Sequence, residues 1–247
     1  MTRTLLLLHG FTGSGASWAA HLPELERRFE VMAVDLPGHA GNRDAASVEA
    51  TADELARRLH RPRRVHVLGY SLGARVALRL AVAHPEAVDR LVLESPSAGI
   101  ADPVEREARR RADEQLADEI ERDGLEAFVD RWERNPVFAS HASLEPAVAA
   151  RQRAIRLAHD PHGLAGSLRL AGQGAMRPLH ERLGTVRAQT LVVVGALDPA
   201  RPRAELVAAG IPGARLVVVD GAGHTPHVER PDAFLRPVID FLQEGAA

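Results

Sequence analysis

The stretch Val65-His-Val-Leu-Gly-Tyr-Ser-Leu-Gly-Ala-Arg75 decides the fold of this chain. Its first four residues are an apolar run that predicts a buried strand, and Gly69-Tyr-Ser-Leu-Gly73 matches G-x-S-x-G, a sharp strand-to-helix turn that exposes a serine. The glycines fit because a Cβ on either side of a strained residue would collide with the backbone. Good helix formers follow, as the motif requires. A chance match in a glycine-bearing turn is the alternative, but we interpret Ser71 as the reactive serine.

Short apolar runs alternate with helical patterns through most of the chain. The runs predict strands at residues 4–8, 31–34, 65–68, 91–93, 191–194 and 216–219. The helical patterns lie at residues 18–28, 48–59, 72–83, 202–209 and 233–243. Strands that alternate with helices of this length favour right-handed crossovers, so we predict an α/β fold with a doubly wound, mostly parallel sheet.

The alternation stops between about residues 102 and 187, where no strand-like run occurs. Helical patterns at 104–122 and 125–133 are followed by segments that Pro136, Pro146 and Pro161 separate. We predict a helical cap inserted over the sheet, with residues 1–100 and 188–247 forming the core and residues 101–187 the cap. Both signs of charge are nearly balanced in the cap, so most of its arginines are expected on a solvated face.

The amino-acid composition limits the catalytic mechanisms that this chain could use. The chain of 247 residues has 31 basic and 33 acidic residues, every basic one is arginine, and cysteine is absent. The absence of lysine excludes Schiff-base chemistry, and the absence of cysteine excludes thiol nucleophiles, zinc-thiolate sites and disulfides. A net charge of −2 gives no excess of basic residues that would indicate nucleic-acid binding. The apolar run at 5–8 is much shorter than the ~20 residues of a membrane span. We expect a soluble, cytoplasmic monomer or homodimer that neither inserts into membranes nor binds nucleic acid.

A reactive serine needs a histidine to accept its proton and a carboxylate to orient that histidine, here in the chain order serine, acid, histidine. Asp198 follows the expected strand at 191–194, and His224 follows the expected strand at 216–219. These positions predict a triad of Ser71, Asp198 and His224.

Other residues could take two of these roles. Asp35 and Asp220 are rivals for the acid, although each also suits a turn or strand end. His227 and His9 are rivals for the base. The pair of histidines in His224-Thr-Pro-His227 does not indicate a metal site, because the proline prevents a regular helical face and no third ligand is evident.

The glycine-rich loop His9-Gly-Phe-Thr-Gly-Ser-Gly15 directly follows the first expected strand. Serine hydrolase folds place a backbone-donor loop at this point, so we predict that the Phe11 N–H faces a developing oxyanion. A flexible turn is the alternative.

With these motifs the chain resembles the α/β-hydrolases. It is more closely similar to the family of 2-succinyl-6-hydroxy-2,4-cyclohexadiene-1-carboxylate synthases of menaquinone biosynthesis, commonly called MenH. The more specific shared features are Ser71 with Arg75 and, in the predicted cap, Trp132. The similar stretches are Leu8-His-Gly-Phe-Thr-Gly-Ser-Gly-Ala-Ser-Trp18, Asp35-Leu-Pro-Gly-His39, Gly69-Tyr-Ser-Leu-Gly-Ala-Arg-Val-Ala77, Leu93-Glu-Ser-Pro-Ser97, Phe128-Val-Asp-Arg-Trp-Glu133, Pro136-Val-Phe138, Gly163-Leu-Ala-Gly-Ser-Leu-Arg169 and Gly223-His-Thr-Pro-His-Val-Glu229.

The resemblance implies a lyase that eliminates pyruvate from 2-succinyl-5-enolpyruvyl-6-hydroxy-3-cyclohexene-1-carboxylate, with no metal or cofactor. The N–H groups of Phe11 and Leu72 would stabilise the anion that forms. A serine esterase or carbon–carbon hydrolase that uses the same triad on a small carboxylate-bearing substrate is the alternative, and a non-catalytic ligand receptor is a third possibility.

Arginines are expected to bind the carboxylates of this polyanionic substrate. Arg75 lies in the first turn of the helix after Ser71, where the helix dipole disfavours a cation by ~0.3–1 kcal/mol. An unfavourable arginine beside a reactive serine indicates a functional role. By resemblance, Arg109 and Arg156 are also expected to bind substrate carboxylates. A small shift of the alignment would assign these roles to the neighbouring Arg110 and Arg153 instead.

Two aromatic residues and two departures from the family pattern complete the expected pocket. Tyr70 and Trp132 are expected to line it by resemblance, although each could be core. The turn Pro37-Gly-His-Ala-Gly-Asn42 lacks the usual glycine and serine. The segment Leu170-Ala-Gly-Gln-Gly174 replaces a more common Gly-x-Gly-Thr-Gly, which affects the expected substrate pocket.

Overall fold

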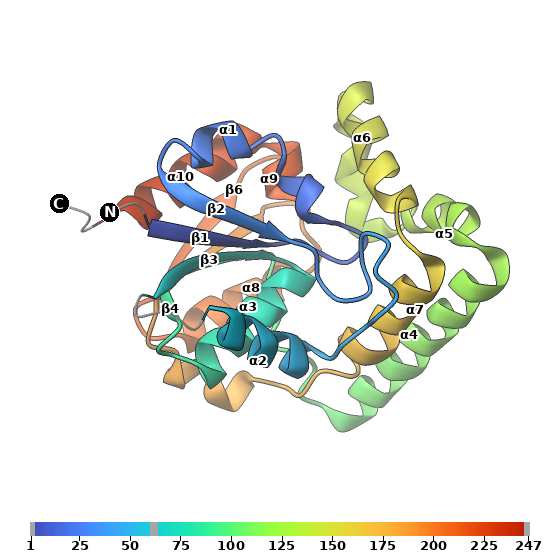
Figure 1. The fold of residues 1–247 in the computed structure, drawn as a ribbon, viewed down its shortest axis with the longest axis horizontal. Helices are drawn as coiled ribbons and strands as arrows, with labels where there is room; N and C mark the ends of the chain where they lie inside the picture. The colour runs from blue at the N-terminus through green and yellow to red at the C-terminus, as the bar shows by residue number, and fades with distance from the viewer. Residues whose placement is uncertain (1–2, 60–63, 245–247) are drawn as a thin grey trace.

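A computed structural model describes residues 3–59 and 64–244, and within them a parallel six-stranded sheet has the order β2-β1-β3-β4-β5-β6 (Figure 1). The α/β-hydrolase fold predicted from the sequence is confirmed. The strands are β1 (Arg3–Leu8), β2 (Phe29–Val34), β3 (Val65–Tyr70), β4 (Val88–Glu94), β5 (Gln189–Gly195) and β6 (Arg215–Val219).

Helices cover both faces of this sheet, so most residues in the middle of its central strands are apolar. Successive side chains of β1 alternate between the two cores: Leu6 and Leu8 join one hydrophobic cluster, whereas Leu5 and Leu7 join the other. The first cluster includes α2 (Val48–Arg58), α3 (Leu72–Ala83) and α8 (Arg201–Gly210). The second includes η1 (Gly15–Trp18), α1 (Leu22–Leu25) and α10 (Pro231–Gln243).

The turn between β3 and α3 has the geometry that the two glycines predict. Ser71 has φ 49° and ψ −103°, a conformation that non-glycine residues rarely adopt. A Cβ on Gly69 would overlap the Gly73 carbonyl, and a Cβ on Gly73 would lie 2.6 Å from the His9 carbonyl oxygen and overlap that of Leu8. Both positions therefore need glycine, and the first turn of α3 lies directly against the end of β1.

The chain between β4 and β5 contains a group of helices on one side of the sheet, which we call the helical insert (Figure 1). Their buried residues, among them Ile120, Phe128 and Leu164, form a separate hydrophobic cluster. Asp102 and Asp160 cap two of the helices through backbone N–H groups. The insert comprises α4 (Pro103–Asp123), α5 (Leu125–Trp132), η2 (Pro136–Ser143), α6 (Pro146–Leu157) and α7 (Pro161–Ala171).

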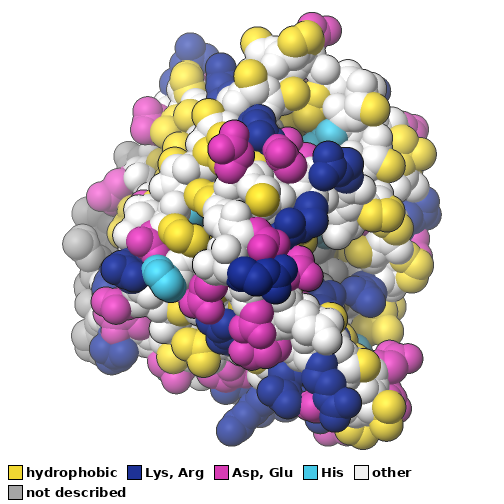
Figure 2. All heavy atoms as spheres, turned by 90° about the vertical axis from the view of Figure 1, so that its right-hand side faces the viewer, with side chains coloured by type: hydrophobic (Ala, Val, Ile, Leu, Met, Phe, Trp, Pro, Cys, Tyr) yellow, Lys and Arg dark blue, Asp and Glu magenta, His cyan; other side chains and the backbone are white. Residues whose placement is uncertain are grey.

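Downstream of the insert, η3 (His180–Thr185) packs against the sheet core, where Leu179 and Leu183 join the cluster of α3 and α8. On the outer face of the insert, arginines and acidic residues lie side by side (Figure 2). Arg169 illustrates this pattern, because it pairs with Glu114, Asp118 and Glu121.

One predicted helix is wrong. Instead of a continuous helix over 18–28, the structure has the 3-10 turn η1, which ends at Trp18, and the single-turn helix α1. A helix running through this segment would place Pro23 in its interior, where proline has no N–H to donate. Pro23 instead lies near the start of α1, where that donor is not needed.

No helix in residues 3–59 and 64–244 is long and apolar enough to cross a membrane.

We predict that Gly73→Ala strongly destabilises the protein, because the new Cβ would overlap the backbone of β1. Overpacking against backbone is expected to reduce the free energy of unfolding by ~2–3 kcal/mol or more, which lowers the Tm by about 5–10 °C. Differential scanning calorimetry measures this shift. Gly184→Ala is the matched control, because no atom lies within 4 Å of the point that its Cβ would occupy. Equal Tm values for the two variants would contradict the prediction.

Candidate active site

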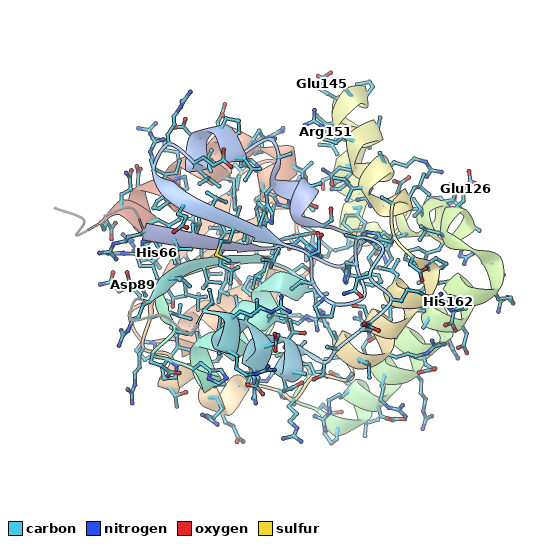
Figure 3. All side chains as sticks on the ribbon, in the orientation of Figure 1. His66, Asp89, Glu126, Glu145, Arg151 and His162 are labelled. Carbon is cyan, nitrogen blue, oxygen red and sulfur yellow. The ribbon has the colours of Figure 1, made fainter. Side chains whose placement is uncertain are left out.

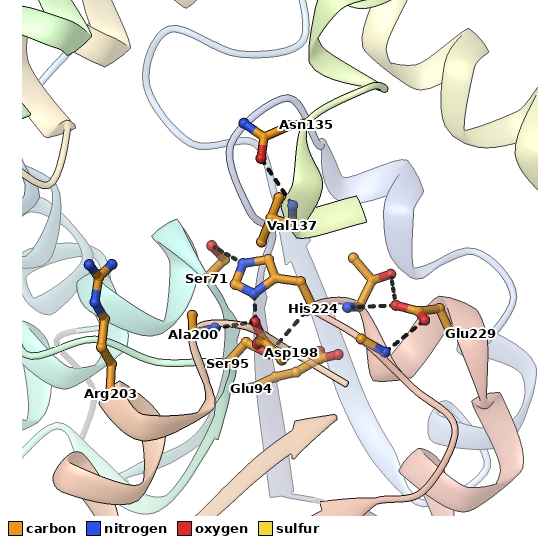
Figure 4. Close-up of polar contacts among 12 residues, drawn as sticks. Ser71, Glu94, Ser95, Asn135, Val137, Asp198, Ala200, Arg203, His224 and Glu229 are labelled. Carbon is orange, nitrogen blue, oxygen red and sulfur yellow. Dashed lines mark hydrogen bonds and ion pairs between the residues drawn. The ribbon is translucent and has the colours of Figure 1, made fainter. Parts of the chain in front are cut away.

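Ser71, His224 and Asp198 form one hydrogen-bonded chain at the carboxyl edge of the sheet (Figure 4). His224 Nε2 lies 3.1 Å from Ser71 Oγ, and its Nδ1 lies 2.8 Å from Asp198 Oδ2. The three residues follow β3, β6 and β5, and parallel strands bring their carboxyl ends to one edge. In this arrangement Asp198 fixes the histidine with its proton on Nδ1, which leaves Nε2 free to accept the serine proton.

Backbone and buried side chains fix the two loops that carry Asp198 and His224. The Ala200 N–H donates to Asp198 Oδ1 over 2.8 Å, and Ser95 Oγ donates to the His224 carbonyl over 3.0 Å. Glu229, in the short helix α9 (Pro226–Glu229), accepts from the N–H groups on both sides of His224, those of Gly223 and Thr225. The histidine loop is therefore held at both ends by one carboxylate.

The protonation states suit proton transfer. Burial raises the pKa of the Asp198 carboxyl, but the hydrogen bonds from His224 and the Ala200 N–H, with the attraction of the imidazole, outweigh burial and bring the pKa below its ordinary value. Glu229 behaves in the same way, because the Gly223 N–H and other donors outweigh burial and lower its pKa. Both carboxylates are therefore ionised near neutral pH.

The rival residues lie elsewhere. Asp35 accepts from the Gly15 N–H over 2.7 Å, as a turn residue does, and Asp220 is exposed after β6. His9 Nε2 accepts from the Leu36 N–H over 2.9 Å. His227 Nδ1 lies 2.8 Å from the buried Glu94 carboxylate. His9 and His227 thus use these ring nitrogens for contacts that stabilise the fold.

Two further histidines, His66 and His162, lie away from Ser71 (Figure 3). His66 and Asp89 lie at the end of the sheet far from the insert, and burial lowers the pKa of His66 to about 4. His162 lies on the insert, 57% exposed, with Nδ1 3.2 Å from Glu121.

A cavity of about 340 Å³ opens above Ser71, between the sheet edge and the helical insert. Ser71 and His224 belong to its lining, as do most of the residues predicted to bind substrate. The predicted residues that line it are Phe11, Tyr70, Leu72, Arg75, Arg109 and Trp132. Burial raises the pKa of the Tyr70 phenol well above its ordinary value, so this hydroxyl stays protonated.

Arg75 is buried at this cavity. Its Nη1 donates to the Ala171 carbonyl over 2.6 Å, and within the described residues no carboxylate oxygen lies within 4.0 Å of its side-chain nitrogens. Burial, followed by repulsion from Arg109, lowers the pKa of the guanidinium to about 10, so it is still charged at neutral pH. A buried cation that lacks a carboxylate partner is unfavourable unless an anion binds beside it.

The insert arginines separate into two groups. Arg109 lines the cavity with Nε 2.8 Å from the buried Asp113 carboxylate, whereas its neighbour Arg110 pairs with Glu107 on the exposed face. Arg156 does not belong to the lining described for the cavity above Ser71. It borders a small neighbouring hollow that shares Phe11, Tyr70 and Phe138 with that cavity, and it pairs with Glu133, as Arg153 also does.

The two residues predicted to supply the oxyanion donors share the cavity with Ser71. Phe11 and Leu72 both line the cavity, and neither N–H donates a hydrogen bond within residues 3–59 and 64–244. Leu72 is the first residue of α3, whose first N–H groups have no carbonyl partner in the helix. Both amides are therefore available to an anion above Ser71.

Several residues of this site are missing from the sequence-based prediction. Glu94 and Glu229 support the histidine loop, and an acidic residue at the end of an apolar strand is a signal that could have identified Glu94. Gln173 and Arg203 line the cavity. No periodicity or motif indicates Arg203, because its position depends on how the insert packs over α8.

The donor set does not suggest a metal centre. Within the described ranges, no group of three or more His, Cys, Asp or Glu side chains is arranged to hold a metal ion.

Comparison with known proteins identifies the family of this chain. The model of the alpha/beta hydrolase family matches residues 5–236. A Bacillus subtilis (strain 168) protein, provisionally named a 2-succinyl-6-hydroxy-2,4-cyclohexadiene-1-carboxylate synthase, is 37% identical over 98% of this chain and 90% of its own length. The structure of MenH from S. aureus has 31% identity and a TM-score of 0.95, covering 100% of this chain and 96% of that one.

Similarity also extends to hydrolases. A pimeloyl acyl-carrier-protein methyl ester esterase of Aeromonas hydrophila is 30% identical over 96% of this chain and 94% of its own length. The resemblance inferred from the sequence motifs is confirmed by these matches. The chain belongs to the alpha/beta hydrolase family and, within it, to the group of 2-succinyl-6-hydroxy-2,4-cyclohexadiene-1-carboxylate synthases.

Proposed function

We propose that this protein is a lyase of menaquinone biosynthesis that releases pyruvate from 2-succinyl-5-enolpyruvyl-6-hydroxy-3-cyclohexene-1-carboxylate. One observation carries the proposal: Arg75, a buried arginine that has no carboxylate partner among the described residues, lines the same cavity as the hydrogen-bonded Ser71 and His224. A substrate that bears carboxylates would supply the missing partner, whereas a neutral substrate would leave the buried charge unpaired.

The proposed chemistry begins with proton transfer. His224 accepts the Ser71 hydroxyl proton at Nε2 while Asp198 holds the proton on Nδ1. The Ser71 oxygen then removes the proton from ring C2 of the substrate. The electron pair moves through a conjugated anion and breaks the bond between the ring carbon and the enolpyruvyl oxygen. Pyruvate leaves and takes up one proton, which balances the proton removed from C2.

The amides of Phe11 and Leu72 would stabilise the conjugated anion. Each donor of this kind is worth roughly 10²–10³ in rate when it is fixed in place before the reaction. Leu72 begins α3 and Phe11 lies in the loop directly after β1, so both amides would be in place before the reaction. No metal or covalent intermediate is required by these steps.

The helical insert would act as the cap of this site, with core residues 1–100 and 188–247 below it and residues 101–187 above. Trp132 and Phe138 support this role, because both line the cavity from the insert side. Their apolar rings would exclude water and strengthen each charge contact in the cavity.

Hydrolysis is the second candidate, and the similarity to an esterase favours it. The same serine would attack an ester carbonyl and form an acyl-enzyme, which water then cleaves. Trapping of an acylated Ser71 during turnover would support this reaction, whereas elimination leaves Ser71 unmodified.

We expect Ser71→Ala to lower kcat for pyruvate release by about 10²–10⁴-fold, since it removes the general base. The variant should fold normally, because alanine replaces serine without adding an atom. A coupled lactate dehydrogenase assay measures pyruvate release. Ser143→Ala, which changes an exposed serine of the insert, is the control. Near-wild-type release by the Ser71 variant would contradict the proposal.

We also expect Arg75→Ala to weaken transition-state stabilisation of the polyanionic substrate by ~2–4 kcal/mol, because a desolvated charge pair is lost. Arg75→Lys should recover only part of the loss, since an ammonium lacks the two-pronged guanidinium geometry. The comparison is kcat/KM for this substrate against a small neutral ester. Arg79→Ala, one turn further along α3, is the control. Equal losses on both substrates would mean that Arg75 only supports the elbow.

A further inference from the structure

Arg203 lines the cavity from the core side, on α8 just after the Asp198 loop. Figure 4 shows its side chain rising from α8 on the side of Ser71 opposite Glu229. The residue is exposed, in contrast to the buried Arg75. Its position therefore corresponds to the mouth of the cavity.

The polar partner of Arg203 is neutral. Its Nη1 donates to Gln173 Oε1 over 3.1 Å, and within the described part of the chain no carboxylate forms an ion pair with it. Gln173 itself stands in the segment that departs from the family pattern, just after α7 of the insert. A glutamine orients the guanidinium without neutralising its charge.

A neighbouring arginine on the same helix shows the contrast. Arg201 Nε lies 2.7 Å from the Glu205 carboxylate, one turn along α8, and Arg201 is not part of the cavity lining. Both arginines lie in the first turn of α8, where the helix dipole disfavours a cation. Arg201 is compensated by its ion pair, whereas the described protein gives Arg203 no such compensation.

The charges around the cavity do not balance. Among the described residues, Arg75, Arg109 and Arg203 line it together with one carboxylate, that of Asp113, so the described lining carries an excess of two positive charges before His224 is considered. The substrate of the proposed reaction carries three carboxylates, on the ring, the succinyl group and the enolpyruvyl group. Asp113 already pairs with Arg109, so two guanidinium groups of the described lining, those of Arg75 and Arg203, remain for the substrate carboxylates.

We propose that Arg203, oriented by Gln173, binds a carboxylate of the polyanionic substrate at the mouth of the cavity. This inference rests on the proposed function and adds a specificity residue to it. Gln173 acts as a positioning residue, since it touches the guanidinium and leaves the other nitrogens of Arg203 free for a two-pronged contact with the carboxylate.

The test compares variants that differ in where a charge is removed. Arg203→Gln should lower kcat/KM for pyruvate release about 5- to 30-fold, mainly through KM, because a ground-state contact is lost. Arg203→Lys should recover part of this loss. Arg201→Gln, which removes the same charge two residues away, should stay within about twofold of wild type. Hydrolysis of a neutral ester should not change in any of them.

Gln173→Glu gives a second, independent variant. The new carboxylate would pair with Arg203 and withdraw it from the substrate, so kcat/KM should fall about as far as in Arg203→Gln. Combining the two substitutions should add little further loss, since both act on one contact. Thermal unfolding of each variant shows whether any loss comes from misfolding.

A binding measurement separates failure of this inference from failure of the proposed function. Isothermal titration calorimetry with 2-succinylbenzoate, a stable aromatic dicarboxylate, needs no turnover. We expect binding by wild type and Arg201→Gln, and about 5- to 30-fold weaker binding by Arg203→Gln. Equal affinity in all three proteins, or no binding by any of them, would overturn the inference. Wild type that binds this probe but releases no pyruvate would overturn the proposed function alone.

Discussion

The contact between the first turn of α3 and the end of β1 is the constraint on which the site depends. It is possible only because Gly73 has no Cβ to meet the carbonyl oxygens of Leu8 and His9. The same contact holds Ser71 at φ 49°, and the Ser71 N–H donates to the Glu94 carbonyl over 2.9 Å. A strained residue persists when its surroundings fix it on several sides, as β1, β3 and β4 do here.

A second set of constraints is electrostatic. The buried carboxylates Glu94 and Glu229 bind His227 and the amides beside His224, and these contacts keep the imidazole ring of His224 in place in the loop after β6. The cavity above has the opposite character. Among the described residues its arginines outnumber its carboxylates, so the electrostatic potential around Ser71 favours anions.

Much of the fold could be predicted from the sequence because its signals are local. Strands buried on both faces give continuous apolar runs, and helix α3 begins and ends where the pattern at 72–83 predicts. The prediction for residues 18–28 is wrong because the apolar residues there have helical spacing, although Pro23 prevents one continuous helix. Strand ends such as Phe29 and Glu94 lie outside the predicted strands, since pairing with neighbouring strands extends a strand beyond its apolar run.

The sequence by itself determined the elbow serine, the order of serine, acid and histidine, and the arginine beside the serine, because each depends on a short motif after a strand. Only the tertiary structure decided which arginines share the cavity. Arg109 lines it and Arg156 does not, whereas Arg203 enters it without any sequence signal. The reason is physical: the cavity wall forms where the insert packs against the core, and such long-range packing leaves no periodic trace in either segment.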